Sequence, residues 1–305
     1  MRKTCLNTIY GLAKKNSKII FIGSDLGPGV LKKFKDSMPD RFYMEGVSEQ
    51  SIVGMSAGLA MEGYLPYINT ISTFLTRRCF EQIAVDLCLH KLPVKLIGNG
   101  GGLVYAPLGP THQAIEDISI LRTLPNMSII APCDAIEMKK LIEDTVKLKG
   151  PLYVRIARGG EKIISKEKDK IKFGKARLLK KPKNYLIIST GVTAQLALNA
   201  AEIFDSMKND VCGVLHFNTI KPIDYKNLIK YTKKVKRIVT IEENVLSGGF
   251  GSLILETLNF HSPKDTSKVK KIGLADKFID KYGTQEELFK KNNLTANNIV
   301  KKLLK

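Results

Sequence analysis

The sequence lacks any apolar run long enough to cross a membrane. No apolar stretch approaches the roughly 20 residues that span a bilayer. The N-terminus begins basic, and polar residues then break its apolar positions at helical spacing. This pattern predicts a surface helix rather than a signal peptide. We therefore expect a cytoplasmic protein that has no membrane partner.

Cysteine and histidine are scarce and scattered. The 5 cysteines form no Cys-x-x-Cys pair, and their odd number leaves one over. With 4 histidines beside them, the chain offers neither a zinc site nor a disulfide framework. The cysteines are therefore expected to be reduced and mostly buried.

Acidic residues are outnumbered by basic ones, 29 against 49, which gives a net charge of +20. An excess of this kind attracts phosphate groups and is typical of nucleic-acid-binding proteins. However, 40 of the 49 basic residues are lysines spread along the chain, and no nucleic-acid-binding motif accompanies them. We therefore expect no nucleic-acid partner, since an acidic subunit or an anionic substrate would use the same charge.

Short runs of β-branched residues alternate with helical patterns. Such alternation is typical of βαβ units and predicts an α/β fold in which mostly parallel sheets are flanked by helices. The expected strands of the first half are 18–22, 66–71, 94–97, 128–131 and 152–156. The expected helices between them are 49–62, 74–89, 111–124 and 134–148.

A lysine-rich segment, 161–183, interrupts this alternation and is interpreted as a linker or an edge hairpin. The alternation then restarts, with expected strands at 185–190, 211–217, 237–241 and 270–274. Near the end, 284–287 has the form of a capping box ahead of a helix predicted from Leu288, and another helix is expected from Thr295. We predict two α/β domains, residues 1–165 and 181–305, joined by a linker at 166–180.

The most informative stretch is 46–63, which is interpreted as a turn followed by a helix. Ser48 is placed to cap this helix, and Glu49 lies in its first turn, where the helix dipole favours a carboxylate. Gly54 and Gly58 lie four residues apart on one face. Because each glycine costs a helix roughly 1 kcal/mol, the pair predicts that another backbone or a ligand comes close there.

Segment 46–50, Gly-Val-Ser-Glu-Gln, resembles the G-[IV]-x-E-[QH] signature of the transketolase group, which includes deoxyxylulose-phosphate synthases. Further similar segments follow in the same order: Ser-Thr-Phe-Leu-Thr-Arg at 72–77, Phe-Glu-Gln-Ile at 80–83, Gly-Pro-Thr-His-Gln at 109–113, Pro-Asn-Met at 125–127, Ala-Pro-Cys-Asp at 131–134, Thr-Ile-Lys-Pro-Ile-Asp at 219–224, and 242–252. The ordered set covers nearly the whole chain. The chain therefore resembles a transketolase pyrimidine-binding domain followed by a transketolase C-terminal domain.

The resemblance implies that three residues bind thiamine diphosphate. Glu49 matches the glutamate that hydrogen-bonds the aminopyrimidine ring nitrogen, and proton sharing at that nitrogen activates the cofactor. Phe74 matches the aromatic residue that stacks on the pyrimidine, and Arg77 is expected to line the same pocket. Without the resemblance, Glu49 would be interpreted as a solvated carboxylate, Phe74 as core and Arg77 as a surface residue.

The resemblance also implies three residues that face the substrate. His112 matches a histidine whose imidazole donates to a substrate oxygen as charge moves during carbon–carbon cleavage. Arg158 matches a strand-end arginine that holds the substrate's phosphate, a group that the guanidinium fork suits, and Arg2 resembles a second such arginine. The remaining histidines are expected to be structural: His90, His216 and His261.

The chain departs from the family pattern at several substrate positions. Leu108 stands where typical transketolases carry an aspartate that reads a substrate hydroxyl, Gly100 where they carry a phosphate-contacting histidine, and Gly29 where they carry a serine. The arginine that deoxyxylulose-phosphate synthases place near Gly101 is also missing. These departures favour a modified or nucleotide-linked sugar over an ordinary pentose or hexose phosphate. The surrounding run 98–102 is interpreted as a flexible turn, with an anion-binding nest as the alternative.

No Gly-Asp-Gly sequence occurs in the chain. The family uses this motif and a later asparagine to hold the cofactor's diphosphate through Mg²⁺, a hard cation that requires oxygen ligands. The resemblance therefore implies that the Mg²⁺ ligands lie on a partner, an N-terminal transketolase subunit. We expect an α₂β₂ heterotetramer with two copies of each chain.

The expected function is that of one subunit of a thiamine-diphosphate-dependent enzyme that transfers a two-carbon ketol unit between sugars or sugar phosphates. One alternative is the beta subunit of the decarboxylating component of a 2-oxoacid dehydrogenase, or a deoxyxylulose-phosphate-synthase-like enzyme. An alternative of another class is a non-catalytic scaffolding homologue. The combination of Glu49, Phe74 and His112 favours the catalytic interpretation over the scaffold.

Overall fold

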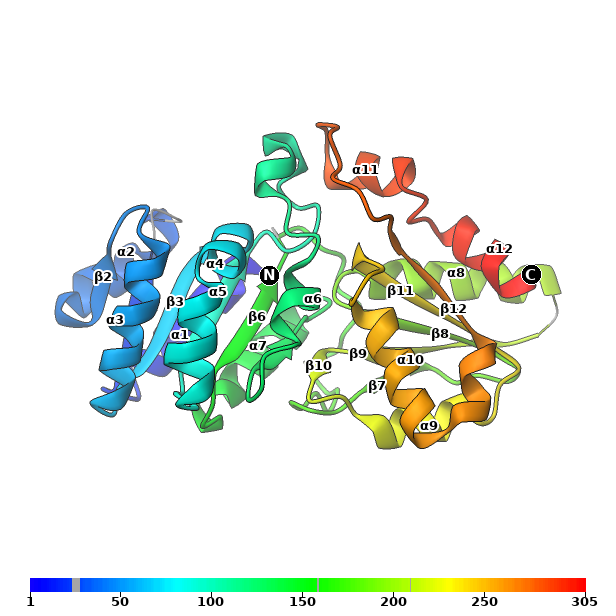
Figure 1. The fold of residues 1–305 in the computed structure, drawn as a ribbon, viewed down its shortest axis with the longest axis horizontal. Helices are drawn as coiled ribbons and strands as arrows, with labels where there is room; N and C mark the ends of the chain where they lie inside the picture. The colour runs from blue at the N-terminus through cyan, green and yellow to red at the C-terminus, as the bar shows by residue number, and fades with distance from the viewer. Residues whose placement is uncertain (24–27, 158, 209) are drawn as a thin grey trace.

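The computed structural model describes residues 1–23, 28–157, 159–208 and 210–305. Two sheets lie side by side along the long axis of the molecule, and helices cover both faces of each (Figure 1). The predicted α/β fold with mostly parallel sheets is confirmed. Within the described ranges, no helix has the length and apolar character needed to cross a membrane.

The first sheet has the order β10-β5-β6-β4-β3-β1-β2. Its strands from the first half of the chain all run parallel to their neighbours: β1 (Ile19–Gly23), β2 (Phe42–Met44), β3 (Leu65–Ile71), β4 (Lys95–Asn99), β5 (Ser128–Ile130) and β6 (Leu152–Ile156). The seventh strand, β10 (Thr219–Lys221), comes from the second half and pairs antiparallel with β5. The two halves of the chain are therefore joined through a shared sheet as well as by the connecting segment.

Two groups of helices sandwich the first sheet. One face packs against α1 (Arg2–Ala13), α2 (Pro28–Ser37) and α7 (Ala135–Asp144). The other face packs against α3 (Glu49–Met61), α4 (Ser72–Arg78), α5 (Phe80–Gln82), the π-helical turn η2 (Ile83–Leu89) and α6 (Asp117–Leu121). Short 3₁₀ turns complete this half: η1 (Pro39–Arg41), η3 (Ala106–Leu108), η4 (Pro110–His112) and η5 (Thr145–Lys147).

Two predicted helices differ from the observed ones. The helix predicted at 74–89 is broken into α4, α5 and η2, because Cys79 between α4 and α5 leaves helical geometry at φ −104° and ψ 17°. The helix predicted at 111–124 is reduced to α6, since Gly109 has a positive φ of 79° and the chain after it forms the turn η4. This irregular stretch carries His112.

The second sheet has the order β12-β11-β8-β9-β7. Its strands are β7 (Arg177–Lys180), β8 (Tyr185–Thr190), β9 (Cys212–Phe217), β11 (Arg237–Val245) and β12 (Val269–Leu274). β7 lies in the lysine-rich segment and pairs antiparallel with β9 at the sheet edge. The domain bounds 1–165 and 181–305 stay a proposal, and β7 shows that part of the predicted linker is a strand of the second sheet.

One face of the second sheet packs against α8 (Thr193–Lys208), α11 (Gln285–Lys291) and α12 (Ala296–Leu304). The other face packs against α9 (Tyr225–Thr232) and α10 (Phe250–His261), with the 3₁₀ turn η6 (Pro263–Lys268) beside α10. The predicted capping box is confirmed: Thr284 Oγ1 accepts from the Glu287 amide and the Glu287 carboxylate accepts from the Thr284 amide. Both bonds start helix α11 at Gln285, so the predicted start at Leu288 is wrong.

Candidate functional site

Glu49 lies buried at the start of α3, only 3% exposed. Gly46, with φ 65°, turns the chain into this helix. Ser48 occupies the N-cap position, but its hydroxyl donates to the Glu45 carbonyl at 2.7 Å instead of capping an amide. The Glu49 carboxylate accepts from Thr70 Oγ1, on β3, at 3.5 Å. A carboxylate is thus held inside the carboxyl-terminal edge of the first sheet, where α/β folds place their ligands.

A second contact of Glu49 was not predicted from the sequence. Arg78 Nη1 donates to Glu49 Oε2 at 3.0 Å, and the Arg78 guanidinium carbon lies 4.1 Å from the centroid of the Phe74 ring. Arg78 therefore bridges the carboxylate and the aromatic face. The doublet Arg77-Arg78 is the feature of the sequence that could have indicated this contact. Consecutive residues of a helix point about 100° apart, so the two arginines face different neighbours.

His112 completes this group from a separate loop. Its ring centroid lies 5.1 Å from that of Phe74, with an interplanar angle of 67°. His112 Nδ1 lies 2.9 Å from Thr111 Oγ1, which leaves Nε2 as the other polar atom of the ring. The structure therefore brings Glu49, Phe74 and His112 together through contacts that run from one residue to the next, with Arg78 between the first two. The roles that the resemblance implies for them stay predictions.

The loop before His112 is supported by the second half of the chain. Gly109 has φ 79°, and a Cβ added there would lie 2.8 Å from the ring of Tyr282. Tyr282 belongs to the segment between β12 and α11. The position of His112 therefore depends on a contact that joins residues far apart in the sequence.

Arg77 makes a different set of contacts from Arg78. Its Nη2 donates to the Gln113 carbonyl at 3.2 Å, and its Nε pairs with the Glu116 carboxylate. It lines a cavity of about 540 Å³ at the junction of the two halves, together with Phe278. The predicted contact of Arg77 with the cofactor stays a prediction, and Arg78 occupies the place beside Phe74.

Two arginines, Arg2 and Arg158, were predicted to bind the substrate. Arg2 begins α1, and the amino group of the preceding Met1 binds the Glu161 carboxylate at 2.9 Å. This ion pair places the start of the chain beside the segment that follows β6. Arg158 lies outside the described residues. The roles of Arg2 and Arg158 therefore stay predictions.

The glycine-rich run 98–102 does not present its amides to an anion. The Gly100 and Gly101 amides donate to the Ile156 carbonyl at 2.9 and 3.0 Å, and the Gly102 amide donates to the Ala114 carbonyl at 2.9 Å. A side chain at Gly102 would collide with Glu243. The run is a tightly packed turn, so neither the flexible turn nor the anion nest describes it.

Gly54 and Gly58 have no close neighbour within their own chain. A Cβ added at either position would meet no described atom within 4 Å. The same helix, the turn that follows it and the neighbouring η2 also carry exposed apolar side chains: Met55, Met61, Tyr64, Val85 and Leu89. We call this surface the α3–η2 face. The close packing that the glycine pair predicted is absent among the described residues of this chain.

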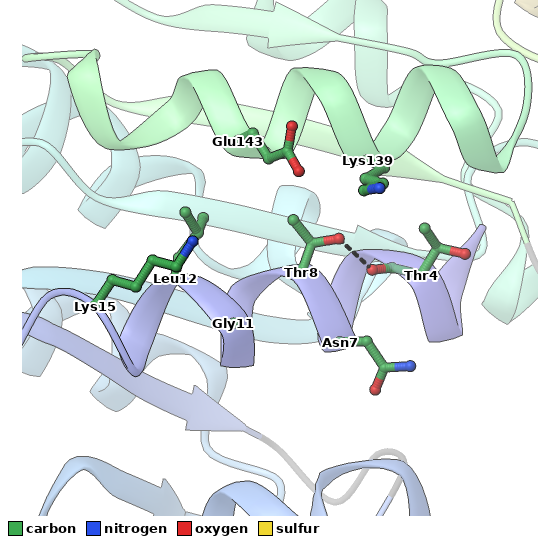
Figure 2. A pocket seen from close by; sticks show the side chains of 8 residues that line it. All are labelled: Thr4, Asn7, Thr8, Gly11, Leu12, Lys15, Lys139 and Glu143. Atoms are coloured by element: carbon green, nitrogen blue, oxygen red, sulfur yellow. Dashed lines mark hydrogen bonds between the residues drawn. The ribbon is translucent and has the colours of Figure 1, made fainter. Parts of the chain in front are cut away.

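A groove of about 500 Å³ lies elsewhere, between α1 and α7 (Figure 2). Its lining is mostly polar: Thr4, Asn7, Thr8, Gly11, Leu12, Lys15, Lys139 and Glu143. These helices cover the face of the first sheet opposite to α3 and α4. The groove contains none of the predicted site residues, so it is a surface feature separate from the candidate site.

A buried cluster of Cys133, Glu137 and His216 also has the composition of a metal site, with ligand atoms within 4.8 Å of one another. However, Glu137 already accepts from Arg177 Nη1 at 2.7 Å and lies 3.0 Å from His216 Nε2. Burial would raise the pKa of Glu137, but His216 and Arg177 hold that pKa below its usual value. The cluster ties α7 to the second sheet, and the structural role expected for His216 stays a prediction. The five cysteines are buried and unpaired, as predicted.

Comparison with known proteins agrees with this arrangement. Residues 1–160 match the family described as "Transketolase, pyrimidine binding domain", and residues 174–299 match "Transketolase, C-terminal domain". A 1-deoxy-D-xylulose-5-phosphate synthase of Clostridium perfringens is 38% identical over 295 residues, 96% of this chain and 47% of that protein. The chain thus spans about half the length of the synthases it matches.

Two relatives of similar length were also found. One of the subunits of an apulose-4-phosphate transketolase from Phocaeicola vulgatus is 34% identical over 306 residues, covering 99% of this chain and 96% of that protein. A solved structure described as "Split gene transketolase, inactive beta4 tetramer" superposes with a TM-score of 0.90 at 30% identity, covering 99% of this chain and 96% of the other. Two matched domains in the predicted order, with relatives aligned along nearly the whole chain, show that this chain belongs to the transketolase family.

Proposed function

We propose that this chain is one subunit of a thiamine-diphosphate-dependent, transketolase-like enzyme that transfers a two-carbon ketol unit between sugars. The observation that carries the proposal is the buried Glu49 carboxylate beside the stacking face of Phe74 and the His112 ring. These three residues supply a carboxylate, an aromatic platform and a proton donor within one small site. A solvated surface carboxylate would not be accompanied by an aromatic platform and a histidine.

The residues present fit the aminopyrimidine part of the cofactor. Arg78 shows the fit, because its guanidinium is a planar N–H donor that lies on Phe74 and hydrogen-bonds Glu49. An aminopyrimidine ring is also planar and carries nitrogen-bound protons. Thiamine diphosphate, when bound, supplies the reactive carbon and the electron sink for carbon–carbon cleavage. Glu49 would hold the proton shared with the ring nitrogen, and Phe74 would support the ring face.

His112 would act on the substrate side. Thr111 contacts Nδ1, so the ring is oriented with Nε2 as the atom available to a substrate oxygen. A donor at that atom stabilises negative charge that develops on the oxygen. Arg158 and Arg2 are proposed to hold a phosphate of the substrate, with Arg77 as a further lining residue.

The substrate is proposed to differ from an ordinary ketose phosphate. Leu108 is exposed beside Gly109 and presents an apolar side chain where typical transketolases carry an aspartate. The related protein from Phocaeicola vulgatus is named for apulose-4-phosphate, which supports an unusual sugar as one reactant. A donor screen in which common ketose phosphates outperform every other substrate would overturn this part.

We further propose that a partner chain completes the site. The chain has no Gly-Asp-Gly motif, so the diphosphate and Mg²⁺ are assigned to an N-terminal transketolase subunit. The α3–η2 face is apolar, and Glu49 begins the helix that forms it. A subunit that brings the diphosphate to this ring site has to approach α3, and Gly54 and Gly58 permit close approach of its backbone. An α₂β₂ heterotetramer is the proposed assembly.

A second candidate, a deoxyxylulose-phosphate-synthase-like reaction, is favoured by the 38% identity to such a synthase. The products discriminate the two, because a 2-oxoacid donor releases CO₂ and a ketose donor releases none. The direct test is to assemble the chain with an N-terminal transketolase subunit encoded beside it and to measure ketol transfer. Glu49→Ala should abolish turnover while assembly persists. Full activity of Glu49→Ala would reject the proposed role of Glu49.

A further inference from the structure

Arg78 is a residue of the site to which the proposed function gives no role. Its guanidinium neutralises Glu49 across a 3.0 Å ion pair, and the two side chains differ greatly in exposure, 47% for Arg78 and 3% for Glu49. A buried carboxylate without a partner is unfavourable. The chain therefore needs a donor on Glu49 even when no ligand is present, and Arg78 supplies the charged one beside the longer contact from Thr70.

The second contact of Arg78 fixes where the guanidinium lies. Its central carbon is 4.1 Å from the centroid of the Phe74 ring, the distance of a planar cation stacked on an aromatic face. One planar group thus covers Phe74 and donates to Glu49 at the same time. These are the two contacts that the proposed function assigns to the aminopyrimidine ring. Two planar groups cannot occupy the same face of Phe74 and the same oxygen of Glu49 together.

The backbone of Arg78 is anchored while its side chain has room to leave. The Arg78 carbonyl accepts from Gln50 Nε2 at 3.0 Å, which ties the end of α4 to α3. The neighbouring Arg77 is held by the Gln113 carbonyl and the Glu116 carboxylate. Because the Arg78 side chain is half exposed, it has a path out to solvent, whereas the buried Glu49 carboxylate then needs another donor, which the ring would supply.

We propose that Arg78 is a placeholder for the aminopyrimidine ring: its guanidinium occupies the ring's place against Glu49 and Phe74 and has to swing out before the ring binds. This role rests on the proposed function of the site, because Arg78 then competes with the aminopyrimidine ring for Glu49 and Phe74. The apparent affinity for the ring is then lowered by the fraction of chains in which Arg78 is seated. Removing the guanidinium should therefore strengthen ring binding, whereas a residue that helps to hold the ring would weaken it when removed.

The test uses the full chain alone and the isolated ring of the cofactor, 4-amino-5-hydroxymethyl-2-methylpyrimidine, at a pH where that ring is uncharged. A neutral probe excludes a gain that comes merely from relief of charge repulsion. Affinity is measured by calorimetry or by ligand line broadening in NMR spectra. Arg78→Ala should bind about tenfold more tightly than the unmodified chain, as expected if roughly nine chains in ten have Arg78 seated.

Two further variants sharpen the result. Arg78→Lys keeps the charge but loses the planar group, so it should give a smaller gain. Lys32→Ala removes one cation from an exposed ion pair with Asp36 and should leave the affinity unchanged. Adding Glu49→Gln to Arg78→Ala should abolish the gain, because the ring then lacks its carboxylate.

Equal affinity of the Arg78→Ala and unmodified chains, including no measurable binding by either, would overturn the proposal. A gain that survives in the Glu49→Gln double variant would also overturn it, because the ring would then bind elsewhere. Neither result bears on the proposed function, which is tested separately by ketol transfer in the assembled enzyme. Absence of ketol transfer in the assembled enzyme would reject the proposed function, but a gain in ring affinity that depends on Glu49 would still support the placeholder role of Arg78.

Discussion

His112 meets the ring of Phe74 nearly edge-on, with 5.1 Å between the ring centroids and 67° between the planes. The two residues come from different connections of the first sheet, Phe74 from the helix after β3 and His112 from the loop after β4. Their contact places the histidine beside the aromatic platform on which the cofactor ring is proposed to stack. The residue proposed to face the substrate therefore touches the residue proposed to stack on the cofactor ring.

His112 could act in two ways, as a proton donor to the substrate or as a support for the Phe74 ring, and a variant distinguishes them. If His112 donates to the substrate, His112→Ala in the assembled enzyme should lower kcat by roughly 10²-fold, the scale of a lost proton donor. The affinity for thiamine diphosphate should change little. Steady-state kinetics and cofactor titration on the same preparation measure both quantities. A large loss of cofactor affinity with kcat preserved would instead assign His112 to the support of Phe74.

Gly109 sets the path of the His112 loop. Gly109→Ala should destabilise the chain, because φ is 79° and the new Cβ would lie 2.8 Å from the Tyr282 ring. The backbone penalty alone is about 1–2 kcal/mol. Gly174→Ala is the matched control, since φ there is 73° and no described atom lies within 4 Å of the new Cβ.

Urea unfolding of the two variants should show the larger loss for Gly109→Ala, and the assembled enzyme should lose activity with that variant alone. Tyr282→Ala added to Gly109→Ala should restore part of the stability. Equal losses for the two glycine variants would mean that the Tyr282 contact does not hold the loop.

The α3–η2 face predicts an effect on assembly without an effect on folding. A Cβ added at Gly58 meets no described atom within 4 Å beyond its own helix, and leucine is a better helix former than glycine. The isolated chain should therefore keep or gain stability, while association with the partner subunit weakens by at least about tenfold, as expected for a side chain forced into a close-packed interface.

Gly11→Leu is the control for this variant. Gly11 is also a helical glycine without a described neighbour within 4 Å, but it lies on α1, on the opposite side of the first sheet. Analytical ultracentrifugation of both variants with the partner measures the difference. Unchanged association of Gly58→Leu would place the interface elsewhere.

Glu243 predicts a pH dependence of stability. Burial raises the pKa of Glu243 from 4.5 to about 7, although Arg155 and a hydrogen bond from Gln285 oppose the rise. The folded chain therefore keeps this proton where the unfolded chain has lost it. The contribution of Glu243 to the free energy of unfolding is present below about pH 4.5 and is lost as pH rises through about 7.

Glu243→Gln cannot ionise and keeps an oxygen that accepts from the Leu103 amide and Gln285. Its free energy of unfolding should fall less between about pH 5 and pH 8 than that of the unmodified chain, by up to about 3 kcal/mol. Part of the slope should persist, because burial also raises the pKa of Glu242 to about 7. Identical slopes in urea unfolding would show that Glu243 is ionised in the folded chain throughout.

The sequence predicted the features that depend on local pattern. Apolar runs such as 152–156 and 185–190 became β6 and β8 with the expected bounds, because a fully buried parallel strand is apolar along its length. The strand β10 was not predicted, since three residues carry little pattern and their pairing with β5 joins segments far apart in the chain. The break in the predicted helix at Cys79 was also missed, because the helical spacing of the sequence continues across it.

The site was predicted in part. Glu49, Phe74 and His112 were identified by motif resemblance, and the structure places them in contact through Arg78 and the ring pair. Arg78 itself was not identified, because only the phase of α4 decides which of two consecutive arginines faces Glu49. The partner of Arg77, Glu116, lies 39 residues away, and no local pattern announces that pairing.

We propose that this chain holds the ring half of a cofactor site and that a second subunit holds the diphosphate half. The most direct measurement is calorimetric titration of thiamine diphosphate with Mg²⁺, performed on this chain alone and on its mixture with the N-terminal transketolase subunit. We expect tight binding in the mixture and weak or undetectable binding by the chain alone. Tight, Mg²⁺-dependent binding by the chain alone would contradict it.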